Sequence, residues 1–517
     1  MIQYKGAQWF KCDFHLHTPA SECFLDRTVT PEAWVQACLD AGLQCVAVTD
    51  HNTGAWIDSI KDAAKGKSLT VFPGVEITCD TSKIHLLVIF DESKTTQNIE
   101  DFLLRCDIDR GKFSKQDAHS SLTIIDIAKK ANDAGALVIP AHIDEFNGLA
   151  YCAGGSSVKD FYALPFVHAV QFVHEVFLEP ALKVKGNQEL LTSINEYYGR
   201  ATAAIGENNI SDAYNGIRTA KAAKKCLLTF SDNPDSKDSA KHGLSGIGYR
   251  YSWIKMDSQP SLEGIRQAFM MPDRTKHYFE CRNSPYIEPR LWIRKISIQN
   301  TTITPKNEVV SVEFNPQLTT IIGGRGSGKS SILRFMRGVF GLQKDLEGLP
   351  EIKEDYDNFF KKVDEEGLGV LKDDTKVEVY YVRDKIEYRI TYDNSIKKSI
   401  IERYDIIQND YVLVSDEGFL DFFQFEEYSQ KQIFSIAQKP NSLRNRIDSA
   451  IKDMDELQNS YGQLRQEYRS LKSSLRSLQR AVKDKGKLIT EIKDLDGKIK
   501  LLKQYRLRIQ VKHERGI

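Results

Sequence analysis

Imidazole and carboxylate side chains stand at the ends of short apolar runs in the first half of this sequence. In CDFHLHTPAS, His15 and His17 are two residues apart, so both side chains face the same side of an extended strand. The other such residues end or open further apolar runs, and they are Asp50, His51, Glu76, His85, His142 and Asp232. Ligands of these types and number suit Zn²⁺, Mn²⁺ or Fe, and a shared carboxylate such as that of Glu76 could bridge two ions about 3.5 to 4 Å apart. Clustered ions of this kind activate water for attack on phosphorus.

The alternation of apolar runs and amphipathic stretches in residues 1–285 predicts the elements that must position these residues. Short apolar runs such as CVAVTD and IHLLVIF alternate with amphipathic stretches such as PEAWVQACLDAG and SLTIIDIAKKANDAG. This alternation predicts an α/β fold with parallel strands. Barrel-type α/β proteins carry their chemistry at the carboxyl ends of the strands, which is where these side chains stand. Asp50 could also cap a helix N-terminus.

The ordered motifs at these residues resemble those of the PHP (polymerase and histidinol phosphatase) superfamily: H-x-H, T-D-H, G-V-E, further histidines and S-D-x-H. The resemblance covers roughly residues 10–280 and implies a PHP-type (β/α) barrel with metal-dependent phosphoesterase activity at two or three ions. It implies catalytic roles for Asp50, His51, Glu76 and Asp232, with Asp50 placed behind the ligands. The implied metal ligands are His15, His17, His51, Glu76, His85, His142 and Asp232, with Asp26 as the early additional ligand.

One position departs from the PHP pattern. The last motif of the family supplies a histidine two residues after its aspartate, whereas this chain reads SDNPDS and has Pro234 in that place. Asp235 or His242 could substitute for the missing histidine; otherwise the centre holds two metals or has altered activity. The remaining histidines are interpreted as hydrogen-bonded structural residues, and they are His119, His168, His174, His277 and His513.

A second chemical motif lies in the middle of the chain. Gly323 to Ser330 read GGRGSGKS, which fits the phosphate-binding pattern G-x-x-x-x-G-K-[ST]. A strand, LTTII, is predicted before it, and a helix, SILRFMRGVFG, after it. Backbone N–H groups would cradle the phosphates of ATP, Lys329 would reach the β and γ oxygens, and the Ser330 hydroxyl would complete the coordination of Mg²⁺. The predicted nucleotide-binding residues are Gly323, Gly326, Ser327, Gly328, Lys329, Ser330 and Ser331.

The wider strings KISIQN and VEFNPQLTTIIGGRGSGKSSIL resemble the head of SMC-like, ABC-class ATPases. The resemblance places Gln408, in IIQNDY, where that family's glutamine contacts Mg²⁺ and the attacking water; a polar surface residue is the alternative. Such heads dimerise around ATP, which implies a homodimer. Their catalysis also needs a signature motif and a Walker B aspartate and glutamate, and neither precedes Ile517. We therefore expect a truncated chain, or a second lobe supplied from elsewhere, and weak nucleotide binding without competent hydrolysis.

The C-terminal segment is predicted to be the start of a coiled-coil arm. Apolar or aromatic residues recur at 3/4 spacing from Tyr461 to Val482. Residues 441–517 contain 19 Lys and Arg against 10 Asp and Glu, which suits either phosphates of nucleic acid or a solvated helix surface. The predicted domains are 1–285 (PHP), 286–440 (N-terminal lobe of the ATPase head) and 441–517 (arm).

Composition limits the number of domains and the class of protein that this chain can form. With 517 residues, 41% hydrophobic and 27% charged, the chain is long enough for two or three domains. No apolar run approaches the roughly 18 to 20 residues of a membrane span, and the N-terminus does not resemble a signal peptide, so a cytoplasmic protein without membrane contact is expected. The nine cysteines form no C-x-x-C pair and are interpreted as reduced thiols.

The order of the two domains resembles that of TrlF-type ATPases, which suggests nucleic-acid surveillance or anti-phage defence. The leading hypothesis is a metal-dependent phosphodiesterase or nuclease coupled to an SMC-like ATPase. One alternative is a nucleic-acid-binding ATPase in which the PHP unit is degenerate and structural. Another is a small-molecule phosphatase, for which a coiled-coil arm has no evident use.

Overall fold

The structure of this chain is a computed structural model. It describes residues 5–115, 117–196, 206–236, 239–346, 350–414, 423, 425–438, 444, 447, 451 and 453–516. By its internal contacts the chain divides into two units, Met1–Arg325 with Asp373–Asp416, and Gly326–Lys372 with Glu417–Ile517. The predicted domain boundaries at 285 and 440 stay predictions.

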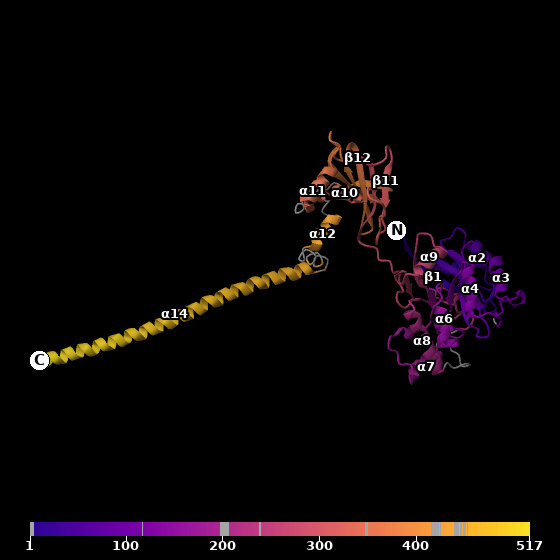
Figure 1. Cartoon of the computed structure of the whole chain (residues 1–517), viewed down its shortest axis with the longest axis horizontal. Helices are drawn as coiled ribbons and strands as arrows, with labels where there is room; N and C mark the ends of the chain where they lie inside the picture. The colour runs from indigo at the N-terminus through magenta and orange to yellow at the C-terminus, as the bar shows by residue number, and fades with distance from the viewer. Residues whose placement is uncertain are drawn as a thin grey trace. The chain divides into compact units, whose positions relative to one another are not determined.

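A seven-stranded sheet forms the centre of the N-terminal part (Figure 1). Its order is β5-β4-β3-β2-β1-β8-β9, in which β1, β2 and β3 run parallel and the other neighbours are antiparallel. The expectation of parallel neighbours therefore holds only for the middle of the sheet, because β4 and β8 run opposite to the strands on either side of them. The strands are β1 (Gln8–Leu16), β2 (Cys45–Val48), β3 (Thr70–Thr78), β4 (His85–Ile89), β5 (Leu137–Pro140), β8 (Ser252–Met256) and β9 (Thr275–His277).

A separate parallel pair, β6 (Ala169–Gln171) and β7 (Cys226–Leu228), accompanies this sheet. The sheet and its helices confirm the predicted mixed α/β class. The helices are α1 (Pro31–Asp40), α2 (Ile57–Ala64), α3 (Thr96–Arg105), α4 (Ile124–Asp133), α5 (Leu149–Cys152), α6 (Gly155–Tyr162), α7 (Gln188–Glu196), α8 (Glu207–Ala222) and α9 (Leu262–Phe269).

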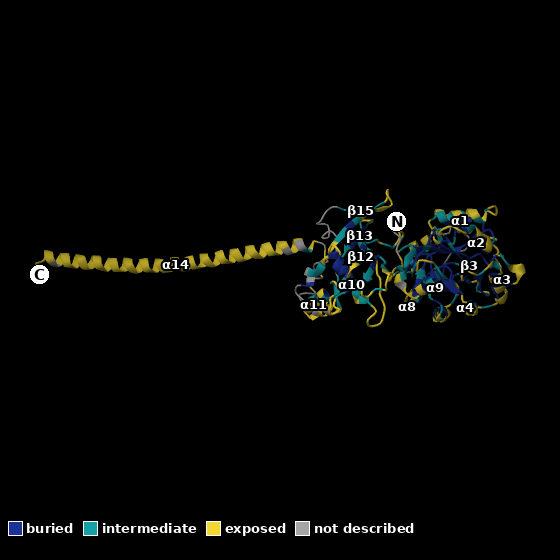
Figure 2. Cartoon of the chain, turned by 90° about the horizontal axis from the view of Figure 1, so that it is seen from above, coloured by how far each residue is buried: buried dark blue, intermediate teal, exposed yellow. Residues whose placement is uncertain are grey.

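Two apolar clusters fill this part of the molecule, which is dark blue in Figure 2. The larger cluster takes the buried faces of α1 to α4, including Trp34 and Phe102. The second holds Phe14, Phe72 and Phe230, with the Phe14 ring centroid 6.1 Å from that of Phe72 and 5.4 Å from that of Phe230. Because each fully buried ring stabilises the fold by about 1.5–3 kcal/mol, these strands hold the residues at their ends in fixed positions.

A six-stranded sheet follows in the chain, in the order β11-β10-β12-β13-β14-β15. In β12, Val377, Val379 and Tyr381 are buried at every second position, as expected for a strand with one face packed. The strands are β10 (Leu291–Thr301), β11 (Val309–Glu313), β12 (Leu371–Arg383), β13 (Ile386–Asp393), β14 (Lys398–Asp405) and β15 (Asp410–Leu413).

The predicted strand LTTII is wrong. Residues 314–324 contain no strand, and the side chains of Leu318 and Ile322 are 80% and 90% exposed. A strand needs a neighbour for its backbone N–H and C=O groups, and no described strand pairs with this run. An apolar sequence is therefore not sufficient to make it a strand here.

The other unit is helical. Its helices are α10 (Lys329–Phe340), α11 (Pro350–Phe359), α12 (Gln430–Gln438) and α14 (Met454–Glu514). The long helix α14 confirms the predicted helix of the arm, but its described residues are exposed along its whole length (Figure 2). Its pairing in a coiled coil thus stays a prediction. Among the described residues, the search for a helix long and apolar enough to cross a membrane finds none.

Candidate metal centre and nucleotide-binding loop

The strand ends bring the predicted ligand residues together. His15 lies near the end of β1, Glu76 near the end of β3, and His85 opens β4. Loops after β2, β5 and β7 supply the rest, which are His51, His142 and Asp232. Donor atoms of these residues fall into overlapping groups, each within 4.8 Å, and three groups are His15–His17–Glu76, His51–Glu76–His85 and His15–His142–Asp232. The arrangement agrees with the predicted placement, and ligation itself stays a prediction.

Glu76 is the centre of the cluster and is 1% exposed. Its Oε1 lies 2.7 Å from His85 Nδ1 and 3.3 Å from His142 Nε2. Its Oε2 lies between 3.0 and 3.4 Å from three other ring nitrogens, His51 Nδ1, His15 Nε2 and His17 Nε2. The two oxygens thus face two different sets of imidazoles, which is the geometry that a bridging carboxylate requires.

The donor set fits divalent cations. Among the described residues, five buried polar atoms of the cluster have no partner in hydrogen-bond geometry, although most of them lie at ion-pair distance from one another: His15 Nε2, Glu76 Oε1 and Oε2, His85 Nδ1 and His142 Nδ1. Each such atom costs about 1–3 kcal/mol if it stays unsatisfied. Imidazole nitrogens and carboxylate oxygens are the ligands of Zn²⁺, Mn²⁺ and Fe, and a bound ion would satisfy these atoms.

The electrostatics keep the two carboxylates charged. Burial opposes the charge of Glu76, but His85, His15 and His51 outweigh it and hold the pKa of Glu76 well below its usual range. Desolvation likewise opposes the charge of Asp232, and its imidazole neighbours hold its pKa below the usual range. Carboxylates that remain ionised inside a buried site are suited to cations.

The imidazoles divide into two kinds. Burial lowers the pKa of His51 well below its ordinary value and lowers that of His242 to about 3, so both rings are neutral, the form that binds metal. For His17, burial also lowers the pKa, but the hydrogen bond with Asp232 and the nearby carboxylate of Glu76 prevail and raise it to about 10. A cation bound beside His17 would replace this proton.

Gln171, which the sequence reasoning missed, orients the ring of His15 and holds the backbone of His142. It ends β6, is 1% exposed, and its Oε1 accepts a hydrogen bond from His15 Nδ1 at 2.9 Å and from the His142 backbone N–H at 3.3 Å. Because an amide oxygen only accepts, His15 carries its proton on Nδ1 and presents Nε2 to the cluster. Gln171 also ends an apolar run, so counting amides among the run-ending polar residues would have found it.

Asp50 acts through Ser21 instead of entering a ligand group. Its carboxylate accepts hydrogen bonds from the Thr18 N–H and hydroxyl, at 2.7 and 2.6 Å, and from the Ser21 hydroxyl at 2.6 Å. Ser21 Oγ in turn lies 3.3 Å from His17 Nδ1 and accepts the His51 N–H at 3.0 Å. Through Ser21, Asp50 therefore orients the ring of His17 and holds the backbone of His51, and a direct role in proton transfer stays a prediction.

The backbone is strained where two of these residues stand. His142 and Asp232 have φ angles of +26° and +53°, in the left-handed region that residues other than glycine rarely adopt. The register of β1 against β2 also shifts between Asp13 and Leu16, next to His15. Such irregularities cost about 1–3 kcal/mol each and occur where a side chain must be aimed at a site.

The early additional ligand was assigned wrongly to Asp26. Its side chain is exposed and accepts hydrogen bonds from the backbone and hydroxyl of Thr28, as in a turn. The structure instead places Cys23 and His242 in a fourth donor group, together with His17 and His51. Asp235, the other suggested substitute for the missing histidine, belongs to none of the groups, nor do the five histidines interpreted as structural.

Removing the acceptor at Gln171 is expected to weaken metal binding about 10- to 100-fold, because the ring of His15 loses the atom that orients it and the backbone N–H of His142 loses its acceptor. The variant is Gln171→Met, which keeps the volume without an acceptor, and affinity is measured by competition with a chelator. The matched control, Gln171→Glu, keeps an acceptor oxygen and should retain most of the affinity. Wild-type affinity in Gln171→Met would show that the ring orientation does not depend on this residue.

The phosphate-binding motif is a glycine-dependent loop at the start of α10. Gly326 and Gly328 both have φ of +83°, which a side chain would strain. Gly328 is the N-cap of the helix, and its carbonyl accepts the Ser331 N–H at 2.9 Å. Lys329 Nζ lies 3.2 Å from Ser327 Oγ. The N-terminus of a helix, with its backbone N–H groups beside a lysine, is suited to binding phosphate. Gly323, the first residue of the motif, lies in the irregular segment before the loop.

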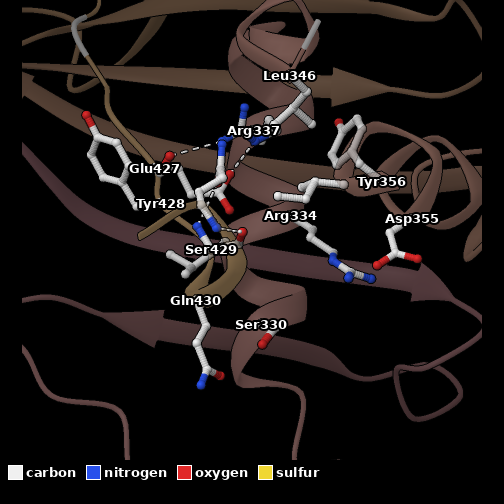
Figure 3. Close-up of a pocket in the computed structure, with 13 residues that line it drawn as sticks. Ser330, Arg334, Arg337, Leu346, Asp355, Tyr356, Glu427, Tyr428, Ser429 and Gln430 are labelled. Carbon is white, nitrogen blue, oxygen red and sulfur yellow. Dashed lines mark hydrogen bonds and ion pairs between the residues drawn. The ribbon is translucent and has the colours of Figure 1, made fainter. Parts of the chain in front are cut away.

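A cavity of about 210 Å³ lies beside this helix and brings a second glutamine to the loop (Figure 3). Both Ser330 and Gln430 line it, and Figure 3 shows their side chains at the same end. Gln430 opens α12, where Ser429 and Gln432 form a capping box: the Gln432 N–H donates to Ser429 Oγ and the Ser429 N–H to Gln432 Oε1. The S-x-x-Q pattern was a local signal that the sequence reasoning missed.

A buried ion pair holds the chain that leads to Gln430. The guanidinium of Arg337, on α10, pairs with the carboxylate of Glu427 and also donates to the carbonyl oxygens of Glu427 and Leu342, both at 3.0 Å (Figure 3). Removing one partner of a buried pair costs about 3–5 kcal/mol, so the contact is a firm connection between the two segments.

Gln408, the glutamine assigned from the SMC-like resemblance, lies in the exposed turn between β14 and β15 and donates its N–H to Asp405. We therefore expect Gln430→Ala to weaken the Mg²⁺-dependent binding of ATP about tenfold, because a hydrogen bond to a charged group contributes about 1.5–3 kcal/mol. Gln408→Ala is the matched control and should bind as wild type in fluorescence titrations with labelled ATP. The reverse result would restore the assignment of Gln408.

Family models match both parts of the chain. A model described as "PHP domain" matches residues 13–142, and one described as "AAA domain" matches residues 295–506. The first contains most of the Glu76 cluster, while Asp232 and His242 lie beyond its matched residues. The second contains the phosphate-binding loop, Gln408 and Gln430.

Relatives match the chain in part. The 5'-3' exoribonuclease Rnm of Escherichia coli (strain K12) is 35% identical over 79 residues, which are 14% of this chain, and the match spans only 26% of that protein's length. The lesion-specific endonuclease PfuEndoQ from Pyrococcus furiosus is 16% identical, with 52% of this chain and 58% of that chain covered and a TM-score of 0.36. A two-domain protein from Bacteroides vulgatus with a PHP-like metal-dependent phosphoesterase is 14% identical, with 60% and 85% covered and a TM-score of 0.35.

Proposed function

We propose that this chain, which joins a PHP domain to an AAA domain, is a metal-dependent phosphodiesterase that cleaves nucleic acid and is coupled to ATP bound at the P-loop. The observation that carries the proposal is the buried cluster around Glu76, in which imidazole nitrogens surround both carboxylate oxygens and two carboxylates stay ionised. Divalent ions held there supply Lewis-acid polarisation of a phosphodiester and lower the pKa of water.

The residues of the cluster have different tasks in this proposal. Glu76, which is almost fully buried, holds the two sets of imidazoles at a fixed spacing. Asp232 has a side chain that is 37% exposed, so it is the carboxylate that a phosphodiester and an attacking water can contact. Gln171 and Ser21 keep the imidazoles oriented before any substrate arrives. This preorganisation is what catalysis at a charged centre requires.

Nucleic acid is the substrate class that we favour. The local match to an exoribonuclease supports it, and so does the excess of Lys and Arg in residues 441–517, whose charges suit a phosphate backbone. We further infer Mn²⁺, Zn²⁺ or Fe in the PHP domain, ATP with Mg²⁺ at the P-loop, and a homodimer through the AAA domains. A role in nucleic-acid surveillance or anti-phage defence in the cytoplasm completes the proposal.

The test is a nuclease assay on labelled single- and double-stranded DNA and RNA with Mn²⁺, with and without ATP. Wild type is compared with His15→Ala/His17→Ala and with His168→Ala, a histidine outside every donor group. We expect wild type and His168→Ala to cut at least one polynucleotide and the double variant to be inactive. A small phosphomonoester, tested alongside, should be a poor substrate.

Two outcomes would overturn the proposal. If no polynucleotide is cut although metal analysis shows an occupied centre, the PHP domain is a structural module of a nucleic-acid-binding ATPase. If the double variant cuts as fast as wild type, the cleavage does not belong to this cluster.

A further inference from the structure

We propose that Cys23, His51 and His242, together with His17, form a thiolate-containing metal position that selects Zn²⁺ and adjoins the ions bridged by Glu76. The inference deepens the proposed function, because it rests on the same metal centre. It assigns a ligand role to a cysteine that the sequence reasoning placed among the reduced thiols.

The four donors converge in a buried space. One donor atom from each of the four residues lies within 4.8 Å of the others. Cys23 is 1% exposed, and His242 is 8% exposed. The ring of His242 stacks on that of His17 with centroids 3.9 Å apart, and the His17 and His51 centroids are 4.6 Å apart. Four imidazole and thiol donors therefore surround one small buried space.

The backbone holds Cys23 and His242 together. The His242 N–H donates to the Cys23 carbonyl at 3.1 Å, and the Leu25 N–H donates to the His242 carbonyl at 2.9 Å, which makes a parallel bridge between Phe24 and His242. These are two segments more than two hundred residues apart in the sequence. The thiol and the imidazole are thus carried on a paired piece of backbone, as expected for a built site.

His242 presents the correct nitrogen. Its Nδ1 lies 2.8 Å from the backbone carbonyl oxygen of Asp232, which can only accept. The proton of the ring is therefore on Nδ1, and Nε2 keeps its lone pair for a ligand. A backbone carbonyl that fixes the tautomer in this way is a regular companion of metal-binding histidines.

The turn around Pro234 explains how His242 reaches the position. Pro234 and His242 face each other in an antiparallel bridge, and the Gly243 N–H donates to the Asn233 carbonyl at 2.9 Å. The imidazole of His242 therefore reaches the metal position from the backbone segment that faces Pro234 across the turn. A Cβ on Gly246 would lie 2.2 Å from the Pro234 carbonyl oxygen, so the close packing of this turn depends on that glycine. The proline does not leave the centre incomplete, because the residue across the turn supplies the ring.

The ligand chemistry separates this position from its neighbours. The other three groups combine imidazoles with Glu76 or Asp232, and such sets accept Mn²⁺, Fe or Zn²⁺. A soft thiolate with imidazoles, in fourfold coordination, favours Zn²⁺ and disfavours Mn²⁺. We therefore expect one ion of the centre to remain Zn²⁺ when the others are exchanged for Mn²⁺.

The first test is spectroscopic and uses the full chain with Co²⁺ as the probe. Wild type loaded with Co²⁺ should show a sulfur-to-cobalt charge-transfer band in the near ultraviolet. Cys23→Ser should lose this band and bind about one ion fewer, and His242→Gln should weaken the band. The control is Cys152→Ser, which removes an exposed thiol and should keep the full band. A band of undiminished strength in Cys23→Ser would refute the assignment.

A second measurement needs no variant, in case Cys23→Ser fails to fold. Wild type given one equivalent of Zn²⁺ is examined by X-ray absorption at the zinc edge. A sulfur neighbour at about 2.3 Å supports the thiolate ligand, whereas a shell of nitrogen and oxygen alone at about 2.0–2.2 Å overturns it.

The inference and the proposed function can fail separately. A sulfur ligand in a protein that cuts no polynucleotide would leave the metal position intact and remove the nuclease function. Cleavage with Mn²⁺ in a protein without a sulfur ligand would leave the nuclease function intact and remove the thiolate metal position.

Discussion

Glu76→Gln is expected to lower phosphodiester hydrolysis at least about a thousandfold, which corresponds to about 4 kcal/mol of transition-state free energy. The substitution keeps the shape of the side chain but removes its charge and leaves only one oxygen. Because Oε1 faces His85 and His142 while Oε2 faces His15, His17 and His51, a single amide oxygen cannot serve both sets. The measurements are the turnover of the nuclease substrate and the number of ions per chain, which should fall by at least about one.

The control for this variant is Glu145→Gln, the same substitution at another buried carboxylate. Glu145 is 2% exposed and contacts His174, but it belongs to none of the donor groups. Its activity should stay within about tenfold of wild type. If both variants lose activity equally and unfold at the same lowered temperature, the effect of Glu76→Gln is on stability and the bridging role is wrong.

Lys329→Ala is expected to weaken the binding of ATP about a hundredfold, or about 2.7 kcal/mol. Lys329 is the first residue of α10, beside the two glycines with positive φ, and its ammonium would make charge-assisted hydrogen bonds with the β and γ phosphates. The dissociation constant is measured by isothermal titration with ATP and Mg²⁺. The metal content of the PHP domain should not change.

Lys361→Ala serves as the matched control, because Lys361 is an equally cationic residue that pairs with Asp364 at 2.8 Å. It should bind ATP as wild type. Equal losses in both variants would mean that ATP is held by general positive charge instead of by the loop. ATP binding that survives Lys329→Ala would remove the nucleotide from the proposed function.

Much of the fold was predictable because its signals are local. The helix PEAWVQACLDAG begins at a Thr30 cap that accepts the Ala33 N–H, and SLTIIDIAKKANDAG begins at a Thr123 cap that accepts the Asp126 N–H. The runs CVAVTD and IHLLVIF became β2 and β4. Strand direction was not predictable in the same way, because an apolar run does not specify whether its neighbour runs parallel or antiparallel.

For the candidate site as well, the residues with local sequence signals were predictable and the others were not. His15, His17 and Glu76 were found because strand ends carry them, and the phosphate-binding loop was found because its residues are consecutive. Asp26 was wrong because spacing from His17 says nothing about where a loop turns, and the turn with Thr28 points its carboxylate to solvent. LTTII was wrong because a strand needs a partner as well as apolar residues.

By itself, the sequence determined the two domains, the ligand-rich strand ends, the glycines of the P-loop and the long helix of the arm, since each depends on residues within a few positions of one another. The tertiary structure decided which atoms face the site. Gln171 accepts a hydrogen bond from His15 across 156 residues, and the His17 backbone N–H donates to Asn233 Oδ1 across 216. Cys23 pairs with His242, and Gln430 lines the same cavity as Ser330, only when separate segments pack together. Such pairings follow from the packing of the whole core, and that information is distributed over residues far from either partner.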